Sequence, residues 1–509
     1  MLTALAALAF AQPAWASSAS TLTDGQAPPV TANPEIRDLQ AAYDKLKADD
    51  YAAALPMLLK VTASPSFNGL SSDLRYATYV GLGAAQYQLA QYKEALVTLK
   101  IAVTFDEADF TDWSPLLSVA WILHDTDDET VALTTIAKRW PTRLSEVDDD
   151  AVYDLINRLR KQTGGDEARF RLLAALHDAH WKPNDPFSAP DGLWIDLMGD
   201  YIDRGQLDKA RAVGSDITEP RALIRIAANR RFDSVAGDIP RLRDIGGASD
   251  RELGRLRAAA VAHPEQLAGV VAVSLALIER ERPKEALDLV DATLAKIPAD
   301  KSAKSPFSDP DQLNWLLDRR AKALFRLGQT DKAIAVMEAG AQTTENGQPN
   351  VSQTLNLGGD LEELGRPAEA LAAIKTINET NTAPYGGMFA AEIRACSYAQ
   401  LHDAAGMTAA VEYAKAHIAD SPSTVVDIGV CTRDLDLAAK TLIDELNDPK
   451  LRPDALDLVQ NWLEPKVLSN VAREEHRRLR LVRDRPDVQA AITRVGRIGT
   501  FALYSADDL

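Results

Sequence analysis

The chain has 509 residues, a length that fits about three globular domains or one long repeat array. Hydrophobic residues make up 46 % of it and aromatic residues only 6 %, a composition that allows a large core and favours helices over strands. The formal net charge of −18 gives an acidic surface that repels phosphate backbones, so no nucleic-acid partner is expected.

The N-terminus has the pattern of an export signal. An apolar run from Leu2 to Ala11 is followed by Ala14-x-Ala16 and then Ser17, the small-residue pattern that signal peptidase cleaves. No Lys or Arg precedes the run, so either translation begins upstream or the signal is atypical. Residues 1–16 are therefore predicted to be a signal peptide, and the mature protein is expected in the periplasm or peripherally on the cell envelope. No later stretch approaches 18 uninterrupted apolar residues, so no transmembrane segment is expected.

Residues 17–33 are rich in Ser, Thr, Ala and Pro, which predicts a flexible linker. Helical structure is expected to begin at Asn33-Pro34-Glu35, where a capping side chain precedes Pro and Glu in the first turn.

A repeat of paired helices follows, and it is clearest in residues 76–109. A break at 90–92 separates two helical halves, and the small Gly83 is expected to let the second helix approach closely at Ala95. The positions that define this copy are Tyr79, Leu82, Gly83, Gln86, Ala95, Leu99 and Ala102.

The same register recurs along the chain. Clear copies cover 191–217, 267–298, 314–340 and 351–377, and weaker copies cover 35–65, 113–141, 151–176 and 388–420. Together they resemble the tetratricopeptide repeat, with Leu or Val mostly replacing its large aromatic anchors. The resemblance implies an all-α solenoid of stacked antiparallel helix pairs, wound into a right-handed superhelix whose concave wall is lined by the first helix of each pair.

These copies define the predicted organisation. N-terminal repeats cover 34–218, an irregular helical insert 219–263, C-terminal repeats 264–451, and a helical cap with a basic segment 452–509. In the insert, Gly246-Gly247 is expected to break a helix that restarts at a capping box, Ser249-x-x-Glu252.

The cap is expected to hold a helix at Trp462, a basic helix over Val471–Arg483 and a helix from Pro486 to about Arg497. Residues 466–500 contain nine Lys or Arg against four Asp or Glu, a net of +5. This basic segment is either a solvated helix face or a docking tail for an acidic surface, such as that of the chain's own solenoid.

Motifs for catalysis or metal binding are scarce. The sequence contains no phosphate-binding loop, nucleophile elbow, zinc-protease motif or paired C-x-x-C motif. His177 and His180 lie three residues apart, but no third ligand is indicated, so they are interpreted as polar residues at a helix end. The acidic runs 125–129 and 148–150 are interpreted as helix caps. No cofactor or metal is therefore expected.

The repeat register predicts which side chains line the groove. Lys322 and Arg326 are expected to face Glu362 and Glu363 of the next copy. Mixed charges with interspersed aromatic residues suit a protein or peptide partner. The predicted groove residues are Trp121, Asn157, Arg160, Asp318, Lys322, Phe325, Arg326, Glu362, Glu363, Glu392 and Gln400.

The favoured function is a non-enzymatic protein-binding scaffold of the bacterial cell envelope. One alternative is an accessory subunit of a polysaccharide-export or outer-membrane assembly machinery, and another is an enzyme with an unrecognised site. The oligomeric state is left open.

The two cysteines, Cys396 and Cys431, are 35 residues apart, close to one repeat length. Neighbouring helices lie about 8–10 Å apart, whereas a disulfide needs Cα atoms within about 7 Å. Two separate thiols are therefore favoured, and a disulfide is the alternative.

The export signal predicts the first residue of the mature protein. Mass spectrometry of the protein isolated from its native source should find Ser17 at the N-terminus, because cleavage follows Ala16. A cytoplasmic protein that begins at Met1 would contradict the prediction.

Overall fold

The computed structural model describes residues 34–298, 304–345 and 347–505. The predicted signal peptide, the linker and the Asn33 cap lie outside these residues. The chain is 73 % helical, with its helices packed in consecutive pairs, so the predicted all-α solenoid of helix pairs is confirmed. It divides into two compact units at Leu193–Trp194, before the predicted boundary at residue 218.

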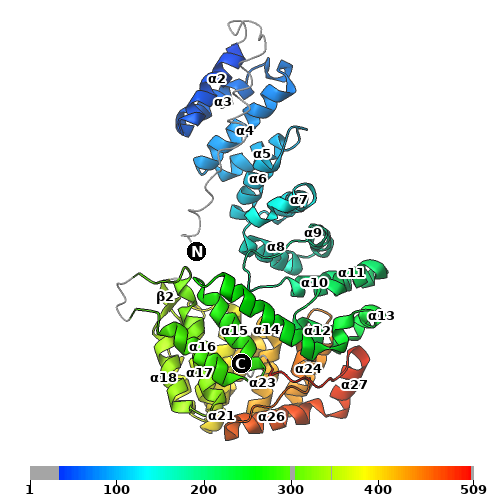
Figure 1. Cartoon of the computed structure of the whole chain (residues 1–509), viewed down its shortest axis with the longest axis vertical. Coiled ribbons are helices and arrows are strands. Elements are labelled where there is room, and N and C mark those ends of the chain that lie inside the picture. The colour runs from blue at the N-terminus through cyan, green and yellow to red at the C-terminus, as the bar shows by residue number, and fades with distance from the viewer. Residues whose placement is uncertain (1–33, 299–303, 346, 506–509) are drawn as a thin grey trace. The chain divides into compact units, whose positions relative to one another are not determined.

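Unit 1 (the described residues 34–193) consists of four helix pairs (Figure 1). The core of its first two pairs is built from apolar side chains of α2, α3 and α4, among them Leu39, Leu58 and Leu82. The pairs are α2 (Pro34–Lys47) with α3 (Tyr51–Thr62), α4 (Ser72–Gln88) with α5 (Tyr92–Ala102), α6 (Phe110–Ile122) with α7 (Thr126–Arg139), and α8 (Asp149–Lys161) with α9 (Asp166–Asp178). The short 3₁₀ helices η3 (Phe67–Gly69) and η4 (Pro141–Glu146) lie between pairs.

Unit 2 (the described residues 194–505) is also built mainly from helix pairs. Its pairs are α10 (Asp191–Asp203) with α11 (Leu207–Asp216), α15 (Leu267–Glu279) with α16 (Pro283–Leu294), α17 (Leu313–Arg326) with α18 (Thr330–Ala341), α19 (Val351–Glu363) with α20 (Pro367–Ala373), α21 (Pro384–Gln400) with α22 (Ala404–Ala416), and α23 (Pro422–Thr432) with α24 (Leu435–Asn447). The division between the units falls within α10.

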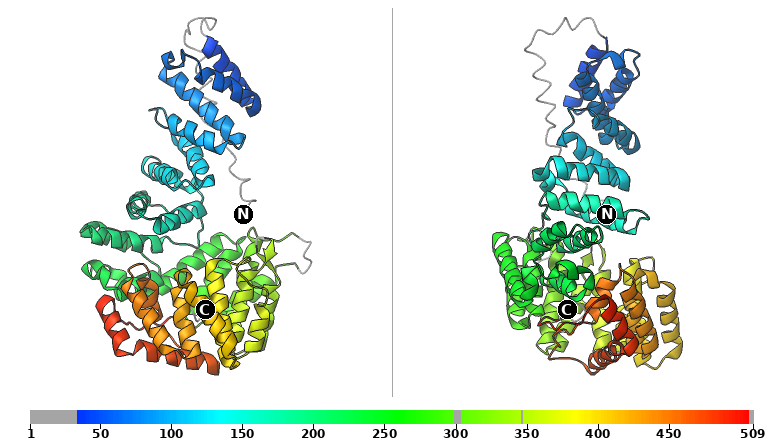
Figure 2. Two further views of the ribbon diagram at one scale, coloured as in Figure 1. Left: turned by 180° about the vertical axis from the view of Figure 1, so that it is seen from behind. Right: turned by 90° about the vertical axis from the view of Figure 1, so that its right-hand side faces the viewer.

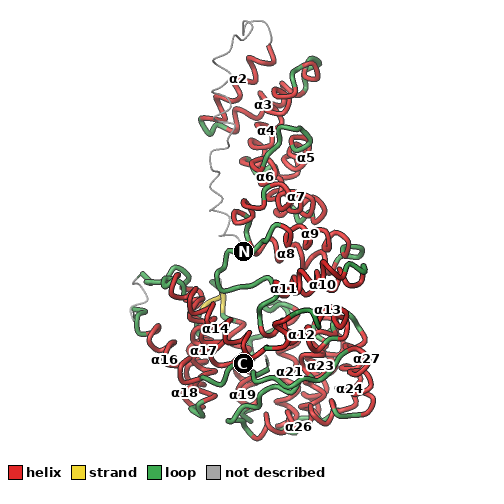
Figure 3. The backbone as a smooth tube through the Cα atoms, turned by 45° about the vertical axis from the view of Figure 1, so that its right-hand side comes forward, coloured by secondary structure: helices red, strands yellow, loops and turns green. Residues whose placement is uncertain are grey.

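Less regular elements complete unit 2, and helices predominate in both units (Figure 3). Between α11 and α15 lie α12 (Pro220–Ala228), η5 (Arg230–Phe232), α13 (Asp233–Ala236), η6 (Pro240–Arg243) and α14 (Ile245–Ala262). Further along are η7 (Pro310–Gln312), the strands β1 (Thr344–Glu345) and β2 (Gln348–Pro349), and η8 (Ile418–Asp420), and then α25 (Arg452–Leu458), α26 (Asn470–Arg483) and α27 (Pro486–Val495). No helix of the described residues is long and apolar enough to cross a bilayer.

The turn within each pair has a recurring left-handed residue. In eight pairs this residue comes two positions after the first helix ends, with φ between 53° and 74°. The next N–H then donates back to a carbonyl five residues earlier, as from Gln91 to Gln86 (2.8 Å) and from Arg366 to Leu361 (2.9 Å). This bond satisfies a carbonyl that the helix end would leave unpaired. The eight left-handed residues are Asp49, Ala90, His124, Gly205, Glu281, Gly328, Gly365 and His402.

Close approach of the paired helices depends on one small residue facing a large one. A Cβ at Gly83 would lie 2.7 Å from Leu99, and one at Gly358 would lie 2.5 Å from Ile374. The predicted close approach at Gly83 is thus confirmed, with Leu99 rather than Ala95 as its nearest neighbour. In α10 and α11 the sizes are exchanged, because Met198 holds the place of the small residue and faces Gly214.

The end of unit 2 returns to the helix α12. Side chains of α12, α24, α25 and α27, among them Ala228, Leu442, Leu456 and Ile492, share one buried core. Arg225 of α12 forms ion pairs with Asp454 (3.0 Å) and Asp457 (3.3 Å). Figure 2 shows this return of the chain's last helices from two further directions.

The predicted capping box at Ser249 is wrong. The helix α14 begins at Ile245 and runs through Gly246-Gly247, because the side chain of Asp244 caps it by accepting a hydrogen bond from the Gly247 N–H (2.9 Å). Ser249 lies buried inside the helix, where its hydroxyl accepts a hydrogen bond from Arg280.

The predicted helix at Trp462 is also wrong, whereas α26 and α27 confirm the other two helices of the cap. The chain around Trp462 is extended and pairs with the C-terminal residues: Asn461 N–H donates to Gly499 (3.0 Å) and Leu463 N–H to Leu503 (2.8 Å). Pro465 disfavours helical backbone at the residue before it, which helps to keep this segment extended.

The cysteines form a disulfide, so the favoured prediction of two free thiols is wrong. Cys396 of α21 and Cys431 of α23 are bonded, with their Cα atoms 5.3 Å apart. The distance of 8–10 Å applies to helix axes, and each Cα lies about 2.3 Å from its axis. Two residues on facing sides therefore come about 5 Å apart, which is close enough for the bond.

The disulfide predicts that unfolded, unreduced protein contains no free thiol. Reduction should lower the free energy of unfolding by about 3–4 kcal/mol, because the bond closes a loop with a sequence separation of 35 residues. Denaturant titration with and without a reductant measures the change. A Cys396→Ser/Cys431→Ser variant is the control, since its stability should be lowered and unaffected by the reductant. Two titratable thiols in the unreduced wild type would contradict the structure.

Candidate functional site

In unit 2 the predicted groove residues of α17 and α19 meet in a buried polar cluster. Lys322 Nζ forms an ion pair with Asp360 Oδ1 (2.9 Å), and the Asn356 amide donates to Asp318 Oδ1 (3.3 Å). Asp318 is only 2 % exposed. Burial by itself would lower the pKa of Lys322, but the carboxylates of Asp360, Asp318 and Glu363 together raise it.

Lys322 therefore pairs with Asp360 and not with the expected Glu362 or Glu363. Asp360 was missed by the sequence reasoning. Its signal was an acidic residue directly between Gly359 and Leu361, a small and an apolar position of the kind that packs against a neighbouring helix.

The position of this cluster follows from the spacing of the first helices. α15 packs on α17, and α21 packs on both α19 and α23, whereas α17 and α19 make few close backbone contacts. The hairpin β1–β2 lies in the connection between α18 and α19. Long polar side chains fill the wider spacing and satisfy one another, which buried charges require.

A second buried group lies at the end of α19. Glu362 is 6 % exposed, and its carboxylate and main-chain oxygen accept hydrogen bonds from the Gln400 amide. Burial, and then the nearby charges of Glu475 and Glu363, raise the pKa of Glu362 well above its usual value. Burial also raises the pKa of Glu475, on α26, to about 7. Gln400 and Glu362 thus interact with each other, in a region that α26 approaches.

The basic C-terminal region lies on the chain's own solenoid, as one of the two sequence interpretations proposed. We call residues 459–505 the C-terminal segment, and the turns between first and second helices the turn edge. Along unit 2, Lys466 pairs with Glu281, the Ser469 hydroxyl donates to the Glu363 carbonyl, and Arg478 donates to the carbonyls of Val430 (3.1 Å) and Cys431 (3.2 Å). The donors thus meet the C-terminal ends of first helices, where unpaired carbonyls carry partial negative charge.

Apolar contacts follow the same line. A Cβ at Gly328 would lie 3.9 Å from Val467, and one at Gly365 would lie 3.3 Å from Val471. The left-handed glycines of two successive turns therefore let the C-terminal segment approach the turn edge closely.

The last described residues cover the end of α17. Arg326 stacks on the ring of Tyr504, with 4.8 Å from its guanidinium carbon to the ring centre. The Tyr504 N–H donates to the Glu279 carbonyl (3.1 Å), and Arg221 donates to the Tyr504 carbonyl (2.9 Å). Tyr504 is almost fully buried by these contacts.

Most of the predicted groove residues of unit 2 are thus covered by other parts of the same unit. Phe325 is half-buried and packs against the core of α17–α21, and Glu392 is also half-buried. Only Glu363 among the predicted residues of unit 2 has an exposed side chain.

In unit 1 the predicted residues are open to solvent. Trp121, near the end of α6, is 37 % exposed. Asn157 and Arg160 of α8 are also exposed. These three residues define what we call the open face of unit 1.

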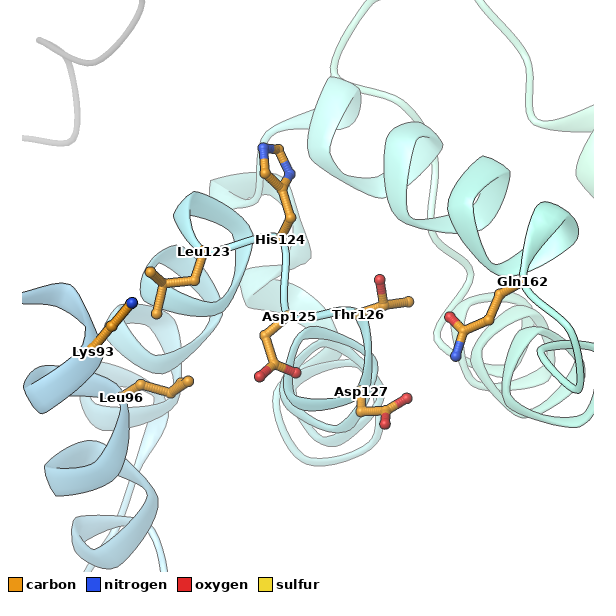
Figure 4. Close-up of a pocket in the computed structure, with 8 residues that line it drawn as sticks. All are labelled: Lys93, Leu96, Leu123, His124, Asp125, Thr126, Asp127 and Gln162. Carbon is orange, nitrogen blue, oxygen red and sulfur yellow. The ribbon is translucent and has the colours of Figure 1, made fainter.

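A hollow of about 550 Å³ lies on the turn edge of unit 1 (Figure 4). Leu96 of α5 and Leu123 at the end of α6 give it an apolar part, and Asp125 and Asp127 begin α7 beside them. His124, with φ of 53°, is the left-handed residue of this turn. The remaining lining residues are Lys93, Thr126 and Gln162.

The other sequence candidates have structural roles. Asp125 caps α7 by accepting a hydrogen bond from Asp128 N–H (3.1 Å), and Asp148 caps α8 by accepting one from Asp150 N–H (2.8 Å), as predicted. His177 belongs to the last turn of α9 and His180 follows that helix, which confirms their interpretation. No group of three or more His, Cys, Asp or Glu suited to a metal ion occurs among the described residues.

Comparison with known proteins assigns the chain to no family. No protein-family model matches the chain, and no curated protein matches it. One similar solved chain belongs to the crystal structure of the APC/C hetero-tetramer Cut9–Hcn1, at 13 % identity over 91 % of this chain and 90 % of that chain, with a TM-score of 0.28. Another belongs to the structure of Naa15/Naa10 bound to HypK-THB, at 12 % identity over 94 % and 76 %, with a TM-score of 0.26.

The Lys322–Asp360 pair predicts a strongly non-additive effect on stability. Lys322→Met or Asp360→Leu alone should lower the free energy of unfolding by about 3 kcal/mol, because each leaves one buried charge without its partner. The double variant should recover most of this loss, since an apolar pair of similar size needs no counter-ion. Urea denaturation of the four proteins measures the coupling. Additive losses would show that the two side chains do not depend on each other.

Proposed function

We propose that this chain is a non-enzymatic scaffold of the bacterial cell envelope that binds a protein partner through the open face of unit 1. The observation that carries the proposal is the contrast between the two units. The matching surface of unit 2 is covered by the chain itself, whereas Trp121, Asn157 and Arg160 remain exposed on the first helices of unit 1.

The chemistry of the open face fits a protein segment. A half-exposed indole offers a large apolar surface with one N–H donor, and tryptophan and arginine are the residues most often responsible for binding energy at protein interfaces. Arg160 adds a charge that an acidic group of the partner would complement.

Two independent features support the envelope location. The N-terminal sequence has the apolar run and the Ala14-x-Ala16 pattern of an export signal. The bond between Cys396 and Cys431 is of a kind that forms and persists in oxidising compartments and is rare where thiols are kept reduced.

The proposal predicts that two substitutions on the open face weaken binding without unfolding the protein. A partner captured by the mature chain from an envelope extract is first identified and purified. Trp121→Ala/Arg160→Glu should then raise its Kd by at least about tenfold, because an aromatic anchor and a charge are lost together.

The matched control is Val131→Ala/Lys284→Glu, which changes one exposed apolar and one exposed basic residue on second helices. This control should bind as the wild type does, and circular dichroism should give the same helicity for all three proteins. Equal affinity of the open-face variant and the wild type would reject the open face as the binding surface.

A further inference from the structure

The C-terminal segment of unit 2 is an example, within this chain, of what a turn edge binds. It places Val467 and Val471 against two successive turns, a serine hydroxyl on one helix-end carbonyl, and Arg478 on two others. Its helix α26 carries Arg473, Arg477, Arg478, Arg480 and Arg483. The turn edge of unit 2 thus binds a basic helix together with the residues that precede it. Two apolar side chains of this ligand, Val467 and Val471, lie four residues apart.

The turn edge of unit 1 has the same backbone construction. Ala90 and His124 hold the left-handed positions that Gly328 and Gly365 hold in unit 2. Each is preceded by a leucine, Leu89 and Leu123 in unit 1 and Leu327 and Leu364 in unit 2. The hollow beside Leu96 and Leu123 lies on the turn edge of unit 1. This edge therefore offers an apolar contact next to helix-end carbonyls, as the turn edge of unit 2 does.

The two edges differ in charge. In unit 1 the seven-residue stretches 48–54, 89–95, 123–129 and 162–168 contain nine Asp or Glu against one Lys, a net of −8. In unit 2 the six corresponding stretches 204–210, 280–286, 327–333, 364–370, 401–407 and 432–438 contain eight acids against eight bases, a net of 0. Acidic residues near a helix N-terminus are favourable in themselves, but the second helices of unit 2 have the same N-termini without this excess.

Part of the acidity of unit 1 is neutralised within the unit. Asp50 pairs with Lys45, Asp128 with Lys100 and Glu129 with Arg158. Among the described residues no ion pair is formed by the acids that remain at the hollow and along its edge, which are Asp49, Glu94, Asp125, Asp127 and Asp166. These charges would attract a basic ligand.

We propose that the turn edge of unit 1, centred on the hollow at Leu96 and Leu123, binds a basic amphipathic helix of a partner protein. Apolar side chains of that helix lie on the two leucines, and its Lys or Arg residues lie toward Asp125, Asp127 and Glu94. The inference rests on the proposed protein-binding function, but it uses a surface separate from Trp121, Asn157 and Arg160.

The probe is a fluorescent peptide with the sequence of residues 464–483, the chain's own example of such a ligand. Titrated with the full mature chain, it should bind saturably, with an affinity that falls as salt rises. Glu94→Lys/Asp127→Lys should weaken binding at least about tenfold, since both side chains are exposed, Asp127 in the lining of the hollow and Glu94 next to the lining residue Lys93. The matched control Asp288→Lys/Glu412→Lys makes the same change of charge on second helices of unit 2 and should stay within about twofold of the wild type.

Three further measurements make the outcome decisive. A peptide of scrambled sequence should bind at least about tenfold more weakly, because the proposal requires the apolar spacing as well as the charge. A photo-crosslinker on the peptide should attach near Leu123. Sedimentation of the mature chain alone should find the same species for the wild type and Glu94→Lys/Asp127→Lys.

Equal binding by the two charge-reversal variants or by the scrambled peptide would overturn the proposal, because nonspecific attraction would then explain the binding. Crosslinking at the turns of Gly328 and Gly365 would also overturn the proposal, because the peptide would then have displaced the C-terminal segment of unit 2. Self-association that disappears in Glu94→Lys/Asp127→Lys would identify a second copy as the occupant instead. The variant Trp121→Ala/Arg160→Glu should bind the peptide as the wild type does. A failure of the peptide experiment is therefore distinct from a failure of the proposed function of the open face.

Discussion

The contact between a small residue on a first helix and a large one sixteen positions later sets the geometry of the helix pairs. Gly83 with Leu99 and Gly358 with Ile374 have this arrangement, and Met198 with Gly214 preserves it with the sizes exchanged. Because interiors are close-packed, the sum of the two volumes matters more than which helix carries the larger side chain. The left-handed turn seven residues after the small position then directs the second helix back along the first.

That regular construction also produces a regular surface. Each first helix ends with carbonyls that its own hydrogen bonds do not satisfy, so successive pairs present a row of acceptors along the turn edge. In unit 2 the chain uses this row itself, with Ser469 and Arg478 as donors and Val467 and Val471 as apolar contacts at the glycines. The same row in unit 1 is accompanied by an excess of acidic side chains, and this difference in charge gives the two edges different possible ligands.

Burial of charge in unit 2 is a consequence of the wider spacing between α17 and α19. A closer approach of these helices would favour small or apolar side chains, whereas the observed spacing is filled by Asp318, Lys322, Asn356 and Asp360. Such a cluster contributes modest net stability, but it disfavours arrangements that would leave any one of its charges unpaired. Polar residues that a repeat register assigns to a groove can therefore be part of a core.

Nine of the helix pairs and their register could be predicted from the sequence, because they depend on the local spacing of small and apolar residues. The pair of α23 with α24 was not among the predicted copies. The sequence also identified the caps at Asp125 and Asp148 and the helices α26 and α27, whose signals lie within a few residues. It did not determine which predicted groove residues are exposed. The burial of Asp318, Lys322 and Glu362 depends on side chains of neighbouring helix pairs, namely Asn356, Asp360 and Gln400, whereas Trp121, Asn157 and Arg160 stay exposed. How closely these pairs approach one another is fixed by the tertiary packing and not by the repeat register.

The bond between Cys396 and Cys431 and the extended chain at Trp462 were decided in the same way. The first depends on which sides of α21 and α23 face each other, and the second on pairing with residues 499–503. The local pattern carries no information on the first, and on the second it offers only Pro465, which disfavours a helix at the residue before it.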